Sequence, residues 1–275
     1  MRNRIVFGLI SMTLIFSLAF SGCGTDGGST DDPALEGTVS IIGAAAVGQM
    51  LFANTDSLQG EGAISYLWKR GNTAEAAGTA IDGATSAIYI LVAADAGKYI
   101  TVTVTRTGYS GNKTSAAVRL YVIGDTGPGG GKIFYVSAGF TNTLTGVACH
   151  YLEAAPADMS TTLAWASSTD SIPGTQTHFG TGAANTVAIL ALDPNAPAAK
   201  ACKDYRGGGK TDWFLPSKDE LNEIFNNKTL LSCATTSYWS SSDSGGAWAH
   251  VFSTGQQYNY QSKINVGCVR AIRAF

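Results

Sequence analysis

YWSSSDSGGAWAHVFSTGQQYNYQSKINVGCVRAIRAF, residues 238–275, is the stretch that decides the fold. Its ends, YWSSS (238–242) and VRAIR (269–273), and the inner segment AWAHVF (247–252) predict strands, because Tyr, Trp, Val, Ile and Phe suit a pleated, half-buried surface. Between them, QQYNYQSKIN (256–265) has no aliphatic alternation and almost no formal charge. Aromatic residues among short amides and hydroxyls are the composition of antibody paratopes. This segment therefore predicts a binding surface that the rest of the chain displays.

The overall composition excludes several classes of protein. At 275 residues the chain is long enough for two domains, and a net charge of −2 with 14% charged residues gives no basic footprint for nucleic acid. Thirty-three glycines against seven prolines favour a strand-rich and loop-rich protein. The three histidines and five cysteines lack zinc-ligand spacing. We expect no metal and no cofactor.

The amino terminus carries an export signal. Arg2 and Arg4 precede an uninterrupted apolar run over 5–20, which is too short for a permanent membrane span. The following FSGC (20–23) resembles a bacterial lipobox, with Phe20 where Leu is usual. The resemblance implies a signal peptide over 1–22, a lipidated Cys23 that anchors the protein to the outer membrane at the bacterial cell surface, and a flexible tether over 23–34. An ordinary cleaved signal is the alternative.

The first folded unit is expected over 35–123. Strands are predicted at ISYLWK (64–69) and YITVTV (99–104), and AADAGKY (93–99) between them resembles the tyrosine corner of immunoglobulin-like domains, with Trp68 as the buried tryptophan. Thr101 stands where those of antibodies have their second disulfide cysteine, and the unit contains no cysteine. We predict an all-β immunoglobulin-like sandwich that acts as a spacer; independent ligand binding is the alternative.

The second unit is expected over 124–275 and opens with GDTGPGGGK (124–132). This segment is not a phosphate-binding loop, because Thr126 occupies the first glycine position and Ile133 follows the lysine. We interpret it as a linker and turn. Ser217 and Glu220 form a capping box that opens a helix to about Phe225. The other predicted elements are strands at 133–136, 151–156 and 212–216, and helices at 186–192 and 198–205, separated by DPN (193–195).

Four motifs in this unit carry a resemblance to a known family: YLEAAP (151–156), DWFLPS (212–217), YWSSS (238–242) and VRAIR (269–273). In this order they resemble bacterial surface domains with a C-type lectin fold of the formylglycine-generating-enzyme type. Within that family the chain is most similar to the variable proteins of diversity-generating retroelements, the treponemal variable lipoproteins above all. The resemblance implies an α+β C-type lectin fold whose variable region, about 238–275, is rewritten by adenine-directed mutagenesis and binds ligand.

The residue types of this region fit such mutagenesis. Mutation of the adenines in an AAC or AAT codon reaches many amino acids and never a stop codon. Tyr258 and Tyr260 would then be rigid aromatic anchors, with strand packing as the alternative. Trp239, Trp248, Val269 and Ile272 are assigned to the core, and Gln256, Gln257, Gln261 and Lys263 are scaffold or differently encoded positions. The candidate ligand-binding residues are Asp243, Ser244, His250, Ser253, Tyr258, Asn259, Tyr260, Ser262, Ile264, Asn265, Gly267 and Cys268.

Two other functions are weaker on sequence. Formylglycine-generating enzymes use a pair of cysteines near the carboxy terminus, whereas Cys268 has no nearby partner, although Cys233 could approach it in space. Cys149, Cys202, Cys233 and Cys268 allow three disulfide connectivities, and structural bridges are expected in an oxidising compartment. DPN (193–195) lacks the further oxygen ligands that a calcium-dependent lectin needs.

We therefore expect a monomeric, non-catalytic surface lipoprotein. It would bind an unknown protein or glycan on a host or bacterial surface, reach the membrane through Cys23, and bind no nucleic acid. A fixed adhesin or carbohydrate-binding domain of the same fold is the alternative, ahead of a formylglycine-generating-type oxidase.

Overall fold

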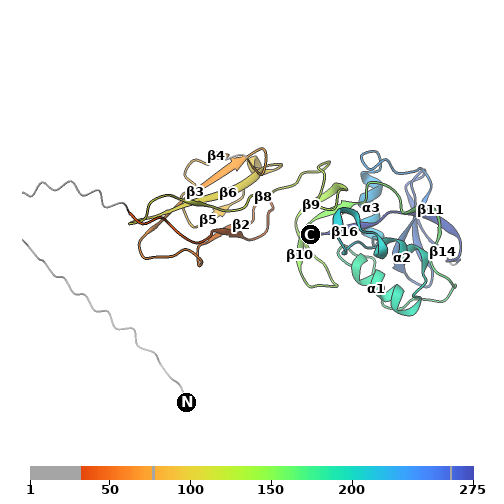
Figure 1. Cartoon of the computed structure of the whole chain (residues 1–275). Helices are drawn as coiled ribbons and strands as arrows, with labels where there is room; N and C mark the ends of the chain where they lie inside the picture. Colours follow the sequence, from red (N-terminus) through yellow and green to blue (C-terminus); the bar gives the residue numbers. More distant parts are fainter. Residues whose placement is uncertain (1–31, 76–77, 261) are drawn as a thin grey trace, which may run out of the picture. The chain divides into compact units, whose positions relative to one another are not determined.

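The computed structural model describes residues 32–75, 78–260 and 262–275, drawn in colour in Figure 1. The predicted signal peptide, Cys23 and most of the predicted tether lie outside these residues. Among the helices that the structure describes, none is long and apolar enough to cross a membrane.

Two β-sheets make up the first half of the described chain (Figure 1). Strands β1 (Ser40–Ile42), β2 (Met50–Asn54) and β5 (Ile88–Ile90) form one antiparallel sheet in that order. The other sheet has the order β4-β3-β6-β7, and β8 also pairs with β6. Its strands are β3 (Ile64–Gly71), β4 (Thr79–Ala80), β6 (Tyr99–Arg106), β7 (Lys113–Thr114) and β8 (Val118–Arg119). The predicted strands at 64–69 and 99–104 are confirmed.

The two sheets share one hydrophobic core without a disulfide. Trp68 is fully buried and stacks on Tyr89 with ring centroids 5.6 Å apart. At the predicted tyrosine corner, the buried hydrogen bonds centre on an aspartate and not on the tyrosine. The buried hydrogen-bonding centre is Asp95, which accepts from the Tyr89 hydroxyl (2.8 Å) and the Arg70 Nε (2.5 Å). Tyr99 is half-buried instead, with the Arg119 guanidinium 4.8 Å from its ring centroid.

The second half contains two further sheets and three α-helices. The small antiparallel sheet has the order β16-β10-β9, from β9 (Lys132–Thr141), β10 (Ala148–Ala154) and β16 (Ile272–Ala274). The large sheet has the order β11-β15-β12-β13-β14. Its strands are β11 (Ser160–Ala164), β12 (Ser237–Asp243), β13 (Ala247–Val251), β14 (Gln256–Tyr260) and β15 (Val266–Val269), and β12 and β15 run parallel.

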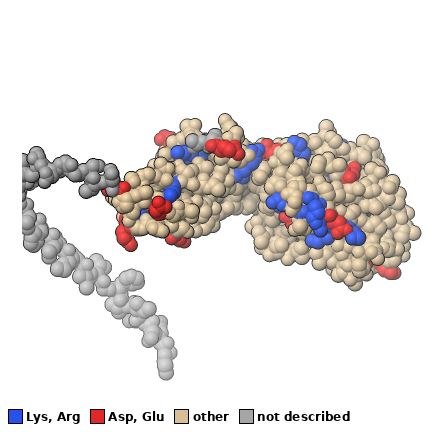
Figure 2. Space-filling view, in the orientation of Figure 1, with Lys and Arg blue, Asp and Glu red and all other residues tan. Residues whose placement is uncertain are grey.

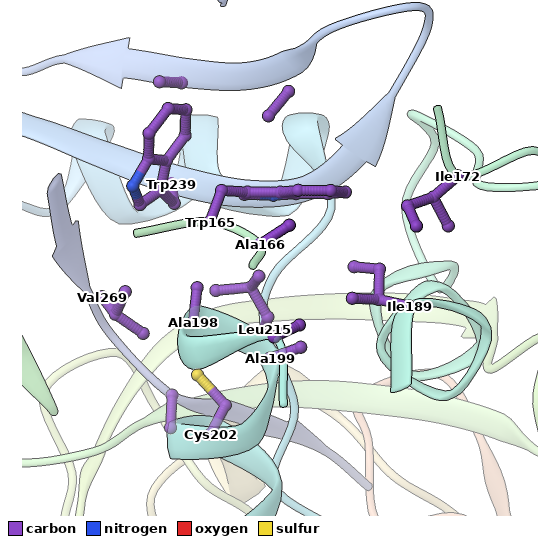
Figure 3. Close-up of a cluster of buried hydrophobic side chains, with 14 of the residues drawn as sticks. Trp165, Ala166, Ile172, Ile189, Ala198, Ala199, Cys202, Leu215, Trp239 and Val269 are labelled. Carbon is purple, nitrogen blue, oxygen red and sulfur yellow. The ribbon is translucent and has the colours of Figure 1, made fainter. Parts of the chain in front are cut away.

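Three α-helices cover the large sheet. Helices α1 (Gly182–Leu192) and α2 (Pro197–Asp204) pack on the face with Trp239, whereas α3 (Lys218–Asn226) packs on the opposite face. Figure 3 shows the first of these cores: Trp165 lies beside Trp239, above the small side chains of α2. The chain is β-rich with a mixed second half, as predicted.

Two predicted strands are different in the structure. Residues 212–216 form only an isolated bridge, in which Phe214 exchanges backbone hydrogen bonds with Ile272. The predicted strand at 269–273 is interrupted after Val269, because Arg270 turns inward. Its Nε donates to Asp158 (2.6 Å), and its Nη1 donates to the Ala155 carbonyl (3.0 Å).

Buried charges join the sequence motifs to one another. The Glu153 carboxylate is fully buried; it accepts from the backbone N–H groups of Gly129 and Gly131 and from Arg273 Nη1 (3.1 Å). Arg273 also makes two hydrogen bonds to Asp212, of 2.9 and 2.7 Å. The glycine-rich turn thus surrounds the protein's own carboxylate, in agreement with its interpretation as a turn.

Helix α3 begins with the predicted capping box. Ser217 Oγ accepts from the Glu220 N–H (3.3 Å), and the Glu220 carboxylate accepts from the N–H groups of Ser217 (2.7 Å) and Gly180 (2.9 Å). Complete burial raises the pKa of Glu220 to about 7, although these hydrogen bonds oppose the shift.

This raised pKa predicts a pH-dependent stability. An unfolded glutamate ionises near its ordinary pKa of about 4.3, so between that pH and about 7 the folded state holds more protons. The Glu220 contribution to the free energy of unfolding is therefore expected to fall as pH rises through this window, by at most about 4 kcal/mol.

Urea unfolding at pH 5 and pH 8 measures this change. Glu220→Gln is expected to remove it, because glutamine does not ionise, whereas Glu223→Gln on the same helix should keep the wild-type difference. An identical pH dependence in all three proteins would contradict the raised pKa.

Candidate ligand-binding surface

A hollow of about 350 Å³ lies on the Trp239 face of the large sheet, bordered by the end of β14 and by the starts of β12 and β15. Trp239 is almost fully buried and presents its ring to the hollow, while Val266 is 63% exposed at its rim. The lining offers hydroxyl, amide, aromatic and aliphatic groups and no ionisable carboxylate, amine, imidazole or thiol. It is formed by Ser237, Trp239, Tyr260, Asn265 and Val266.

Strand β14 provides an aromatic pair beside the hollow. It is the edge strand of the sheet, and alternation along it places Tyr258 and Tyr260 on one face, with ring centroids 6.0 Å apart. Tyr260 packs edge-on against Trp239 at 5.9 Å, whereas Tyr258 is 43% exposed. Tyr260 thus combines core packing with a place in the hollow, and Tyr258 is free to contact a ligand.

The opposite face of β14 carries a second, polar group of side chains. Asn259 lies beside Trp248 in the strand register, and its Nδ2 donates to Ser244 Oγ (2.7 Å). The Trp248 Nε1 donates to the same hydroxyl (3.0 Å), and Lys218 Nζ lies 4.9 Å from the Trp248 ring centroid. The candidate residues therefore occupy two faces of the β13–β14 edge.

A buried ion pair fixes the segment that follows β14. Lys263 is fully buried, and its Nζ donates to Asp243 Oδ2 (2.5 Å) and to the Asp170 carbonyl (2.6 Å). The same ammonium lies 5.1 Å from the Trp165 ring centroid. The Lys263 carbonyl accepts from the Trp165 backbone N–H (2.9 Å). Lys263 is thus a scaffold residue that holds its exposed neighbours Ile264 and Asn265 in place.

Four of the twelve candidate residues are buried, so their assignment to an exposed binding surface is wrong. Asp243 is the partner of Lys263, and its Oδ2 also accepts from the Ile172 N–H (2.6 Å). His250 stacks on Phe225 at 4.4 Å, and burial lowers its pKa. The other two, Gly267 and Cys268, lie in strand β15.

Close packing prevents Gly267 and Cys268 from being variable surface positions. A Cβ atom at Gly267 would lie 2.9 Å from the Trp239 Nε1, so any larger side chain would displace the floor of the hollow. Cys268 is fully buried beside Tyr238, in the core under α3. Neither position can change freely while the sheet keeps its packing.

Ser253 is exposed but does not line the hollow. It belongs to the turn that joins β13 to β14, at the opposite end of this hairpin from Tyr260. Five residues of strand β14 separate the two ends, which corresponds to roughly 15 Å. Of the twelve candidates, Tyr260 and Asn265 line the hollow, and five more lie on strand β14, in the β12–β13 turn beside it or in the segment after it: Tyr258, Asn259, Ser244, Ser262 and Ile264.

Sequence reasoning missed three surface residues and placed a fourth wrongly. Ser237, Val266 and Lys218 were not candidates, and Trp248, assigned to the core, is only partly buried. Period-two alternation could have found two of them, because it places Ser237 on the face of Trp239 and Trp248 on the face opposite Ala247 and Ala249. Val266 and Lys218 reach the surface through strand pairing and helix packing, which leave no local signal.

The four cysteines of the described chain are free thiols, so the expected structural disulfides are absent there. Burial raises the pKa of Cys268 to about 11 and also raises the pKa of Cys233. Both thiols are therefore protonated at neutral pH, which disfavours them as nucleophiles.

On the face drawn in Figure 2, basic and acidic side chains are interspersed and large areas carry neither.

No model of a known protein family matches the chain, and no curated protein matches it either.

Proposed function

We propose that the protein is a surface-displayed lipoprotein that binds a macromolecular ligand, without chemistry, through the hollow on the Trp239 face of its large sheet and the side chains of β14 beside it. More specifically, we propose that it is a variable protein of a diversity-generating retroelement, with an immunoglobulin-like spacer before a domain of C-type lectin fold. The observation that carries the proposal is the combination of an uncharged aromatic hollow with a buried ion pair in the segment that supplies its Asn265.

The buried ion pair supports a binding role for the residues around it. Lys263 holds the segment after β14 from inside, and its neighbours Ile264 and Asn265 have exposed side chains. Exposed positions on a fixed backbone can change at little cost in stability, because surface substitutions usually alter it by less than about 0.5 kcal/mol. Such a surface can acquire new ligands while the protein stays folded.

The lining indicates the chemistry of the ligand. Tyr258, Tyr260 and Trp239 offer rigid aromatic surface, and Asn265 and Ser237 offer hydrogen-bonding groups. These are the residue types that dominate the binding energy of paratopes. The ligand would be an uncharged, hydrogen-bonding surface of a protein or glycan, and the residues would act by contact alone.

Removing one aromatic anchor is expected to weaken binding strongly. The full chain is first screened against a glycan array and a displayed random-peptide library, and the Kd of the strongest hit is measured by calorimetry. Tyr260→Ala should weaken that Kd about thirtyfold, the equivalent of roughly 2 kcal/mol for a buried anchor. Tyr258→Ala tests the same surface at a more exposed side chain.

Thr105→Ala is the control, because Thr105 is exposed on strand β6, outside the sheet that forms the hollow. It should keep the wild-type Kd within twofold. Equal binding by wild type, Tyr260→Ala and Tyr258→Ala would overturn the proposal.

Sequencing the locus and its flanks in several isolates separates a diversified binder from a fixed adhesin or carbohydrate-binding domain. Diversification should change Ser244, Tyr258, Asn259, Tyr260 and their exposed neighbours, with a near-identical template repeat nearby. The buried Asp243, His250, Gly267 and Cys268 should stay constant. A uniform sequence without a repeat would leave the fixed binder, whose neutral aromatic hollow is first tested on sugars.

A further inference from the structure

The outer face of the β1-β2-β5 sheet is apolar, although it belongs to the predicted spacer. Five large side chains point outward from its three strands, and they are between 40% and 58% exposed. Their inward-pointing neighbours Leu51 and Tyr89 lie in the core. The five, which we call the apolar outer face, are Ile42, Met50, Phe52, Ile88 and Ile90.

These side chains form two continuous rows across the sheet. Ile42 pairs with Phe52, and Phe52 pairs with Ile88, so the first row crosses all three strands. Met50 pairs with Ile90 in the next row. None of the three strands contains a charged residue. A sheet with one solvated face normally alternates apolar and polar residues, and these strands do not.

The other sheet of the same unit follows the normal pattern. Its outward positions on β3 and β6 include Ser65, Lys69, Thr103 and Thr105, opposite the buried Trp68. Thr103 hydrogen-bonds across the strands to Thr114 at 2.9 Å. Two sheets around one core thus differ in their outer faces, and only the β1-β2-β5 face lacks polar side chains in its central rows.

The apolar outer face is large for a monomer. Five half-exposed side chains leave on the order of 500 Å² of contiguous apolar surface, which is as large as the largest patch on a typical monomeric protein. Leaving that area in water costs on the order of 10 kcal/mol relative to burial, at the usual coefficient for apolar surface. Such a face is expected to be covered in the working protein.

We propose that a second copy of this chain covers the apolar outer face, so that the protein forms a two-fold symmetric dimer through β1, β2 and β5. In a two-fold dimer the same patch of both copies forms the interface, so the patch must be complementary to itself. The apolar outer face meets this requirement, because it contains no charges that would repel their counterparts in the other copy. Two such sheets stack about 10 Å apart. Together they bury on the order of 1,000 Å², close to the lower limit for a specific interface.

The chemistry of the face favours a second copy over a lipid surface. Membrane-surface segments combine apolar side chains with Lys or Arg, and often with Trp, at the headgroup level. Strands β1, β2 and β5 contain none of these residues, and the acidic Asp56 follows β2. A dimer would also carry two ligand-binding hollows, and bivalent binding raises avidity without any new contact. The proposed dimer differs from the monomer that we expect from the sequence.

Sedimentation velocity on the full chain tests the dimer, with Cys23→Ser introduced so that no lipid is attached. We expect a weak dimer whose fraction rises with protein concentration, because the interface is at the small end of specific interfaces. Ile90→Lys places a charge at the centre of the face and should weaken dimerisation at least tenfold. Ile42→Lys, on the opposite edge strand, should have the same effect.

Thr105→Lys is the matched control, because it adds the same charge to the exposed face of the other sheet. It should sediment like the parent protein, and near-ultraviolet circular dichroism checks that each variant is folded. A parent protein that stays monomeric at 100 micromolar would overturn the proposal. So would a monomer that binds phosphatidylcholine vesicles through Ile90, since the occupant would then be a lipid surface.

Discussion

Asp243→Ala is expected to lower the free energy of unfolding by about 3–5 kcal/mol, which is the cost of removing one partner from a buried ion pair. The Lys263 ammonium, fully buried, would lose its carboxylate partner and keep the Asp170 carbonyl and the Trp165 ring. The Ile172 N–H would lose its acceptor as well. An uncompensated buried charge is among the largest single-residue effects on stability.

Urea unfolding measures the loss, and trypsin measures where it acts. Lys263 is inaccessible in the folded protein, so cleavage after this residue should accelerate in Asp243→Ala before the rest of the chain is cut. The exposed pair Lys200–Asp204 provides the control: Asp204→Ala should leave the unfolding curve unchanged, because exposed ion pairs contribute little. Equal curves for the two variants would contradict the anchoring role of Lys263.

The double variant Asp243→Leu/Lys263→Met separates charge from packing. Replacing both partners with apolar residues of similar size removes the unpaired charge, and such exchanges are often neutral or stabilising. We expect it to regain most of the stability that Asp243→Ala loses. A double variant as unstable as the single one would show that hydrogen bonds to Asp243, and not its charge, hold the loop.

Local features of this fold could be predicted from the sequence. The capping box at Ser217 and Glu220 predicted the start of α3, because its signal lies within four consecutive residues. The strands around Trp68 and Val102, and helices close to α1 and α2, followed from β-branched runs and helical composition. In each case the signal lies within the element itself, in the residue types of a few consecutive positions.

The candidate site was only partly predictable, for a physical reason. Asp243 and Lys263 are twenty residues apart and meet only because β12 and the segment after β14 lie at the same end of the sheet. Codon-based reasoning treated Asp243 as a changeable surface residue, since residue type alone does not report burial. The same limit explains Gly267, where the close Trp239 indole, and not the backbone angles, restricts the side chain.

Three of the four sequence motifs meet in the folded protein. YLEAAP, DWFLPS and VRAIR were informative because they are distant segments joined in the fold: Glu153, Asp212 and Arg273 come from one motif each and meet in a single charge cluster. Their positions on the molecule could not be read from the sequence, and they lie in the scaffold and not at the hollow. The resemblance therefore rests on residues that hold the fold together.

Arg273→Met is expected to lower the free energy of unfolding by about 3–5 kcal/mol, because it leaves the buried Glu153 carboxylate without a cation. Two backbone N–H groups of the glycine-rich turn would remain as hydrogen-bond donors to that carboxylate. Glu153→Gln should cost clearly less, because Arg273 would keep its two hydrogen bonds to Asp212 and the glutamine oxygen could still accept from the turn. Arg206→Met, at an exposed arginine, is the control.

The same contact predicts how stability changes in acid. Burial alone would raise the pKa of Asp212, but the hydrogen bonds and charge of Arg273 outweigh it and lower that pKa below its ordinary value. The contribution of this pair is therefore fully present above about pH 4, the ordinary aspartate range, and is lost as pH falls through the lowered pKa. Acid titration followed by circular dichroism should show this low-pH loss in wild type and in Arg206→Met, and a weaker dependence in Arg273→Met. If Arg273→Met and Glu153→Gln were equally destabilising, the scaffold would depend on the Glu153–Arg273 contact alone, and Asp212 would contribute nothing to the cluster that joins the motifs.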